Sequence, residues 1–317
     1  MTGLASYACF FLTVALTYGL AALGLNLQWG SAGLFNVGVA GFAAVGAYAA
    51  AWITAAPAAS HWGGFALPIP LGWIAAMLAA GAVAAVVGAV TLRLRADYLA
   101  ITTFGAAVSL QLLALNATTL TGGPFGIAFI PKPFESLAAT PLAFGAANLA
   151  LAAAVTGVAF RALERLTRSP WGRVLRALRE DEAAASSLGK APARFRLQAF
   201  VIGAALMGLS GAMQAQFFGF IAPDNYVPVL TFQVWVMLVV GGSGNNRGAL
   251  LGAVVVWGLW SFSGTALTAL LPSDWQARGA ALRVVAIGAA LAAVLLARPR
   301  GLIGERATVS RHVEGEE

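Results

Sequence analysis

Charged side chains are scarce in this sequence. Lys, Arg, Asp and Glu make up 10% of the 317 residues, whereas a water-soluble domain carries about 25%. Mean hydropathy is +0.82, and the apolar residues form long blocks. These features exclude a water-soluble domain, because too little polar surface is left to face water. Lipid is the solvent that suits such a chain, and a bilayer is its first predicted partner.

The apolar blocks themselves almost completely lack Asp, Glu, Lys and His, and acids such as Asp97 and Glu164 lie at block ends. Transporters driven by ions or protons usually keep ionisable groups at membrane depth. The chain also lacks a GxxxxGK[ST] phosphate loop, since the run Gly241 to Gly248 (GGSGNNRG) has no Lys-Ser/Thr ending. The sequence therefore predicts no ATP hydrolysis by this chain, no enzymatic role and no obvious ion coupling.

Cysteine and histidine are nearly absent as well. Cys9 is the single cysteine, so an intrachain disulfide is excluded, and His61 and His312 have no neighbours for a metal site. No metal or cofactor is predicted. The net charge of +7 does not indicate nucleic acid, because the basic residues gather at the ends of apolar blocks. The first block exceeds signal-peptide length without a clear cleavage site, which predicts an uncleaved span.

Apolar blocks long enough for helices predict an all-α, polytopic transmembrane bundle of about nine spans, within a range of eight to ten. The seventh and eighth are short and flank GGSGNNRG, which predicts broken or re-entrant glycine-rich helices. No strand of any length and no second soluble domain is expected. The chain divides into a transmembrane domain (1–301) and a polar cytoplasmic tail (302–317). The predicted spans are Leu4–Leu27, Leu34–Ile53, Leu71–Leu92, Tyr98–Leu120, Leu142–Leu163, Leu197–Phe218, Val229–Val240, Ala249–Phe262 and Ala281–Ala297.

The basic residues also predict an orientation. With nine spans and the amino terminus outside, sixteen of the nineteen Lys and Arg residues lie on the cytoplasmic side, leaving Lys132, Arg278 and Arg283 outside. Cytoplasmic loops of membrane proteins carry this excess of positive charge. The carboxyl terminus is therefore expected in the cytoplasm.

The largest cytoplasmic segment, residues 169–196, reads as one charged amphipathic helix. Ser169 is a candidate cap with Pro170 at the first helical position, and Gly189 followed by Pro192 ends the run. The segment is open to two interpretations: a basic loop that fixes topology and touches lipid head groups, or a docking helix that inserts into a soluble partner. Its apolar residues recur at helical spacing, at Val174, Leu175, Leu178 and Ala185.

Glycines and uncharged polar residues mark a candidate passage. Clustered glycines permit broken helices that line a pathway, but each glycine or amide more often serves close packing or hydrogen bonding between helices. Tryptophans near span ends are explained by an interfacial belt. The candidate residues for the translocation path are Asn26, Gln28, Asn36, Gly38, Thr102, Thr103, Gly241, Gly242 and Gly244.

With these residues in view, the chain resembles the LivM-type permeases of branched-chain amino acid ABC importers. The resemblance runs from about Tyr18 to Gly301 and is clearest in six stretches that occur in this order: Leu23–Tyr48, Leu94–Gly105, Leu120–Ile127, Ser169–Gly189, Leu197–Met213 and Val239–Ala253.

The resemblance implies uptake of leucine, isoleucine and valine across a bacterial inner membrane. It implies a paired LivH-type permease, two cytoplasmic ABC ATPases and a periplasmic binding protein as partners. The ATPase-coupling role then passes to Arg173, Arg176, Arg179, Glu180, Asp181, Glu182, Leu188 and Gly189.

Three alternatives stay open at this point. Related sequences often carry a glutamate and an arginine where this chain has Val108 and Gln111, so urea, short amides or another small polar solute are alternative substrates. A gradient-driven secondary transporter is a second alternative, disfavoured by the missing intramembrane acids. A scaffold that transports nothing is the third, and it has no need of glycine-interrupted spans.

Overall fold

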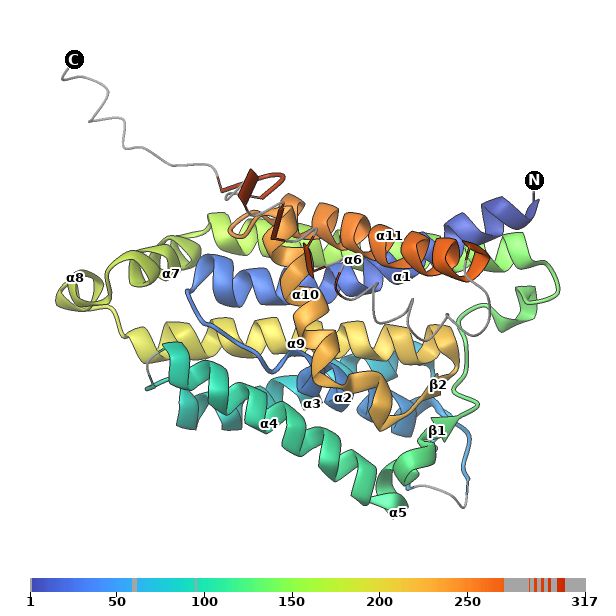
Figure 1. Cartoon of the computed structure of the whole chain (residues 1–317). Coiled ribbons are helices and arrows are strands. Elements are labelled where there is room, and N and C mark those ends of the chain that lie inside the picture. The colour runs from blue at the N-terminus through green and yellow to red at the C-terminus, as the bar shows by residue number, and fades with distance from the viewer. Residues whose placement is uncertain are drawn as a thin grey trace.

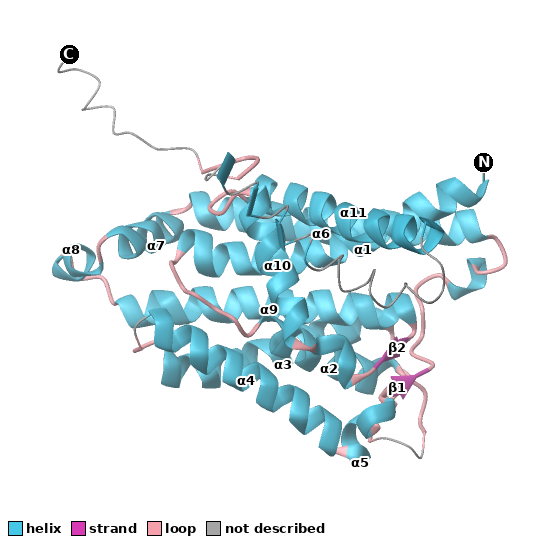
Figure 2. Cartoon of the chain, in the orientation of Figure 1, coloured by secondary structure: helices cyan, strands magenta, loops and turns pink. Residues whose placement is uncertain are grey.

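The computed structural model describes residues 2–58, 62–94, 96–270 and 301–305, with the isolated positions 285, 288, 289, 292, 293, 296 and 297. The predicted ninth span, at 281–297, is described only at those isolated positions, and Arg278 and Arg283 lie outside the described residues. Within the described part the chain is overwhelmingly helical (Figure 2). The all-α prediction is confirmed.

Six helical stretches among the described residues are long and apolar enough to cross a membrane: Gly3–Ser31, Ile69–Thr91, Asp97–Asn116, Pro141–Arg168, Pro192–Phe218 and Pro223–Gly241. They establish a polytopic membrane protein. The long elements are α1 (Thr2–Leu25), continued by a π-helix (Asn26–Ser31), then α2 (Val39–Thr54), α3 (Ile69–Thr91), α4 (Ala96–Asn116), α6 (Pro141–Arg168), α9 (Pro192–Phe218), α10 (Pro228–Gly241) and α11 (Asn246–Leu270).

Several boundaries differ from the predicted spans. The second span begins at Val39 rather than Leu34, because residues 32–38 are not helical. α10 has only 14 residues, as its short apolar run predicts, and it crosses its neighbours obliquely (Figure 1). The prediction of a short eighth helix was wrong, since α11 has 25 residues. Its polar first turn and its residues after Phe262 had been left out of the apolar block.

Proline and glycine explain where several helices begin and end. α6, α7 (Pro170–Glu180), α9 and α10 each begin on proline, whose fixed φ suits the first helical position. α9 ends at Gly219, which has φ +75°. Such left-handed residues are common helix terminators because glycine adopts them without a steric penalty.

The centre of the bundle is formed by α1 and α9, which are far more buried than α4 and α6. Glycine allows these helices to approach closely. A Cβ on Gly46 of α2 would lie 2.2 Å from the carbonyl oxygen of Gly208 of α9. A Cβ on Gly24 of α1 would lie 2.4 Å from that of Gly203. For these two glycines the packing interpretation is the correct one.

Short elements gather at the end of the bundle where α1 begins (Figure 1). They are α5 (Thr118–Thr121), the 3₁₀ turns Gly123–Phe125, Glu135–Leu137 and Pro223–Tyr226, and strands β1 (Ile127–Ala128) and β2 (Phe220–Ile221). β1 and β2 pair antiparallel, with Ile127 opposite Ile221. The expectation of no strand was wrong for this pair, because two-residue strands have no detectable periodicity. Gly126 is required here, since a Cβ would lie 1.8 Å from the Ile221 carbonyl oxygen.

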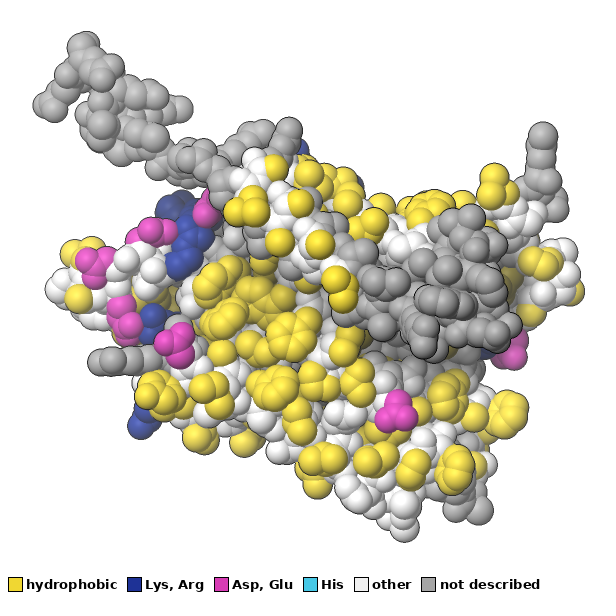
Figure 3. All heavy atoms as spheres, viewed as in Figure 1, with side chains coloured by type: hydrophobic (Ala, Val, Ile, Leu, Met, Phe, Trp, Pro, Cys, Tyr) yellow, Lys and Arg dark blue, Asp and Glu magenta, His cyan; other side chains and the backbone are white. Residues whose placement is uncertain are grey.

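The opposite end of the bundle carries α7 and α8 (Glu182–Ser187), which project beyond the long helices (Figure 1). On the face seen in Figure 3, Lys and Arg side chains gather at this end, while the flank of the bundle is mostly apolar. This separation of charge from apolar surface is what a membrane-spanning body requires.

Candidate functional site

Residues 170–187 form two helices rather than the single helix predicted, and residues 192–196 already belong to α9. The break lies at Asp181, which has extended backbone angles, and its Oδ1 accepts a hydrogen bond from Ala184 N at 2.9 Å. Asp181 thus caps α8, as aspartate commonly does at a helix start. Pro170 opens α7 as predicted, but the Ser169 hydroxyl donates to the Leu166 carbonyl instead of capping. Gly189, at φ +75°, ends the run as predicted.

One face of α7 is packed tightly against the body of the protein. Leu175 and Leu178 are almost completely buried. A Cβ on Gly172 would lie 2.1 Å from the Thr167 carbonyl oxygen, and Arg176 Nη1 donates to that same oxygen at 3.2 Å. α7 is therefore fastened to the last turn of α6, and a movement of α7 must also displace its neighbours.

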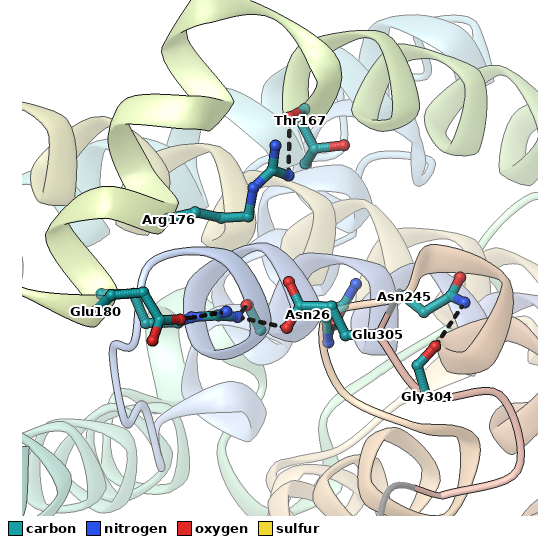
Figure 4. Close-up of polar contacts among 10 residues, drawn as sticks. Asn26, Thr167, Arg176, Glu180, Asn245, Gly304 and Glu305 are labelled. Atoms are coloured by element: carbon teal, nitrogen blue, oxygen red, sulfur yellow. Dashed lines mark hydrogen bonds and ion pairs between the residues drawn. The ribbon is translucent and has the colours of Figure 1, made fainter. Parts of the chain in front are cut away.

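Arg179 connects α7 to two other parts of the chain. Its Nη1 donates to the Gly30 carbonyl in the π-helix and lies 3.0 Å from Glu305 Oε2. Its Nη2 lies 2.7 Å from Glu180 Oε1; Figure 4 shows this region. The pKa of the Arg179 guanidinium lies above its ordinary value. Partial burial lowers this pKa, but the hydrogen bonds and charge interactions with Glu180 and Glu305 raise it by more than burial lowers it. The guanidinium remains charged.

The π-helix is tied to the loop between α10 and α11. Asn26 Oδ1 accepts from Gly244 N at 2.8 Å, and its Nδ2 donates to Asn246 Oδ1 at 2.9 Å. Asn246 in turn donates to Glu164 Oε2 of α6 at 3.0 Å. π-Helical turns are rare and occur frequently at functional sites. Asn26 and Gly244, both predicted for the passage, therefore meet directly at the end of the bundle that carries α7.

A second polar cluster holds the non-helical segment 32–38 against the π-helix and α9. Gln28 Nε2 donates to the Phe200 carbonyl, and Asn36 Nδ2 donates to Gln28 Oε1, both at 2.7 Å. Asn36 Oδ1 accepts from Gly38 N at 2.7 Å. Gln28 and Asn36 are completely buried. In this conformation both amides form hydrogen bonds within the protein, so a place in the passage remains a prediction for them.

The remaining predicted passage residues divide into two groups. Thr103 joins the cluster, because its hydroxyl accepts from Val37 N at 3.0 Å, whereas the Thr102 hydroxyl donates only within its own helix, to Tyr98 and Leu99. Gly241 and Gly242 lie at the end of α10, where residues 301–305 pack against them. Leu302 N donates to the Val240 carbonyl and Ile303 N to that of Gly241, each at 2.9 Å.

Three aromatic rings that sequence reasoning missed lie beside segment 32–38. Trp29, Phe35 and Trp235 form a mutual cluster with ring centroids 4.8–5.5 Å apart. Trp235 Nε1 also donates to the Asn36 carbonyl at 2.9 Å. All three are half-buried. The position of Trp29 among Asn26, Gln28 and Gly30 was a usable signal, but nothing in the apolar run around Trp235 marks it.

Other predicted coupling residues face outward. Arg173, Glu180, Asp181, Glu182 and Gly189 are exposed. Leu188, just past α8, is 79% exposed although it is apolar. Large apolar side chains that lie outside the lipid region and remain uncovered often mark contacts with a partner. Glu182 is additionally paired with Arg196 of α9 at 2.9 Å.

A polar hollow adjoins α7, and an apolar groove lies among the long helices. A polar hollow of about 380 Å³ is lined by Glu164, Arg168, Arg176, Arg247 and Glu305, among others. A larger apolar groove of about 1020 Å³ runs along α3, α6 and α9 and contains no charged lining residue that would hold a zwitterion. The described residues contain no group of three or more His, Cys, Asp or Glu that could hold a metal ion.

Comparison with known proteins identifies a matching family and several similar proteins. The family of permease components of branched-chain amino acid transport systems matches residues 7–296. LivM of Escherichia coli (strain K12), described as a high-affinity branched-chain amino acid transport system permease protein, is 35% identical over 265 residues, which cover 77% of this chain and 60% of LivM. The chain thus spans less than two thirds of that relative.

Two further relatives extend the match. A probable LivM permease of Methanocaldococcus jannaschii is 27% identical and covers 75% of each chain. LivH of Salmonella typhimurium, also a branched-chain amino acid transport permease, is 28% identical and covers 92% of each chain. No solved structure matches. On the match across nearly its whole length, this chain belongs to the family of permease components of branched-chain amino acid transport systems.

Proposed function

We propose that this chain is the membrane-spanning permease subunit of an ABC importer that takes up leucine, isoleucine and valine. In this proposal a paired LivH-type permease completes the passage, two cytoplasmic ABC ATPases supply the energy, and a periplasmic binding protein delivers the substrate. The proposal includes about nine spans in the bacterial inner membrane with a cytoplasmic carboxyl terminus. Family membership and the names of the relatives support the substrate class.

The proposed coupling to the ATPase is supported by the two different faces of the α7–α8 segment. One side is fastened to the bundle through Leu175, Leu178 and Arg179, and the other presents exposed charges and Leu188. A lever between a soluble ATPase and a membrane body needs both sides, because force must enter at one and leave at the other. A loop that only fixed topology would need neither the buried leucines nor the inward arginine.

The passage belongs to the same proposal. A zwitterionic amino acid can be met by amides and backbone dipoles, and its aliphatic side chain by apolar walls. Non-helical backbone at membrane depth is tolerated only against protein or a wet cavity. The non-helical segment 32–38 with Trp29, Phe35 and Trp235 is therefore assigned to the side that faces the passage and the paired permease. Substrate entry there requires the Gln28–Asn36 cluster to rearrange.

The test is uptake of labelled leucine in cells whose other amino-acid importers have been removed. Deleting this subunit together with the paired permease is expected to abolish uptake, and restoring both is expected to recover it. Unlabelled isoleucine and valine should compete with leucine, whereas urea and acetamide should not. Competition by urea or acetamide alone would favour the alternative substrates, and leucine uptake that survives the double deletion would overturn the proposal.

A further inference from the structure

Three arginines lie on α7, and their contacts differ. Arg173 is exposed, and Arg176 bonds to Thr167 at the corner between α6 and α7. Only the contacts of Arg179, among the described residues of α7, reach both the Gly30 carbonyl and Glu305. Its side chain therefore points into the permease, away from the surface that a soluble partner would approach.

We propose that Arg179 is a positioning residue that transmits movement of α7 to the inner end of α1, and that Glu305 holds it in place. This inference rests on the proposed function, because it specifies how a movement caused by the ATPase would enter the spans. It also assigns a role to residues 301–305, which the sequence placed in and beside a polar tail.

Arg179 binds a carbonyl group at the inner end of α1. Gly30 lies in the π-helix that ends α1, where carbonyl groups lack regular helical partners. A charged guanidinium bound to such a carbonyl forms a stronger hydrogen bond than a neutral donor. Gly33, at φ +68°, leaves room for the arginine, since a Cβ there would lie 3.1 Å from Arg179 Cγ. The backbone of this segment is thus shaped around the arginine side chain.

Glu305 is held in place by the segment that carries it. Backbone hydrogen bonds of Leu302 and Ile303 anchor this segment to the end of α10. Glu305 lies over Gly244, where a Cβ would come within 2.8 Å of the carboxylate. Gly244 N in turn bonds to Asn26 of the π-helix. The contacts therefore close a ring from α7 through α1 and the α10–α11 loop back to Arg179.

This ring of contacts predicts that transport can be impaired separately from ATP hydrolysis and ATPase binding. If Arg179 transmits movement, weakening the ring should reduce transport while ATP hydrolysis and ATPase binding persist. If Arg179 contacts the ATPase itself, binding and hydrolysis should fall together with transport. A purely structural role would lower the amount of folded permease instead.

The test uses the assembled importer in proteoliposomes with two pairs of variants. One pair is a chain that ends at Glu305, which keeps the ring, and a chain that ends at Arg300, which removes it. The other pair is Glu305→Gln, which removes the charge that holds Arg179, and Glu135→Gln, which makes the same change at an exposed glutamate of the 3₁₀ turn Glu135–Leu137 at the opposite end of the bundle. ATP-driven leucine uptake, substrate-stimulated ATP hydrolysis and ATPase co-purification are measured for each.

We expect the chain ending at Arg300 and Glu305→Gln to lose about tenfold in uptake per ATP hydrolysed, the scale of one charge-assisted hydrogen bond. The chain ending at Glu305 and Glu135→Gln should both match the intact importer. Unchanged uptake per ATP in Glu305→Gln, or loss of ATPase co-purification in parallel with uptake, would overturn the proposal. Should the chain ending at Arg300 not assemble, Glu305→Gln decides alone. An intact importer that fails to transport leucine would instead contradict the proposed function.

Discussion

Replacing Leu188 with aspartate tests the proposed ATPase-docking surface with little risk to the fold. The side chain is 79% exposed, and substitutions at exposed positions usually change folding stability by less than about 0.5 kcal/mol. Full burial of a leucine in an interface contributes about 1.5–3 kcal/mol. Losing that contribution weakens the ATPase complex by roughly 10- to 150-fold, because each 1.4 kcal/mol is a factor of about ten. The aspartate adds an unpaired charge, so the larger end of this range is expected.

The assay is ATPase binding to the permease pair in nanodiscs, measured by titration at fixed salt. Ser187→Asp is the matched control, since it places the same charge one residue away at an exposed position of α8. Leu188→Asp should lose binding and Ser187→Asp should lose clearly less. Equal binding by Leu188→Asp and the unaltered chain would refute the assignment of this tip as the docking surface. A thermal melt of each permease confirms that the fold is intact.

Two further predictions concern the body of the permease. Asn36→Ala should destabilise the protein by about 1–3 kcal/mol, because the buried partners of Asn36 lose a hydrogen bond; a melt in detergent should show this loss, and Thr102→Ala, which removes only bonds within its own helix, should change little. Gly126→Ala should disrupt the β1–β2 pair because its Cβ would collide with the Ile221 carbonyl; unaltered thermal stability would contradict this packing.

Much of the fold was predictable because membrane helices leave a strong signal in sequence. Apolar length places both ends of α3 and α10 to within two residues, and Pro170 correctly marked the start of α7. Chain order and composition do not reveal polar breaks that depend on tertiary partners. Residues 32–38 are such a break, since Val37 N donates to Thr103 of α4 and Gly38 N donates to the Asn36 side chain. The break at Asp181 is local instead, because its side chain accepts from Ala184 N.

The candidate site was only partly predictable for a similar reason. The clustering of polar residues in the sequence singled out Asn26, Gln28 and Asn36. It did not predict which residues would be their hydrogen-bond partners. The contacts of Asn26 with Gly244 and of Arg179 with Glu305 join residues more than 100 positions apart. No local pattern encodes such pairs, and the half-buried Trp235 looks like any other residue of an apolar helix. The predicted coupling role came from the family resemblance. The structure then distinguished the predicted coupling residues that face the bundle from those that face outward.

The central claim is that this subunit moves solute only when an ATPase acts on α7 and α8. The most direct measurement compares leucine accumulation in liposomes that contain the purified chain alone, under an imposed ion gradient, with accumulation in liposomes that contain the assembled importer and ATP. We predict uphill accumulation only in the second preparation. Uphill accumulation by the isolated chain would contradict the account.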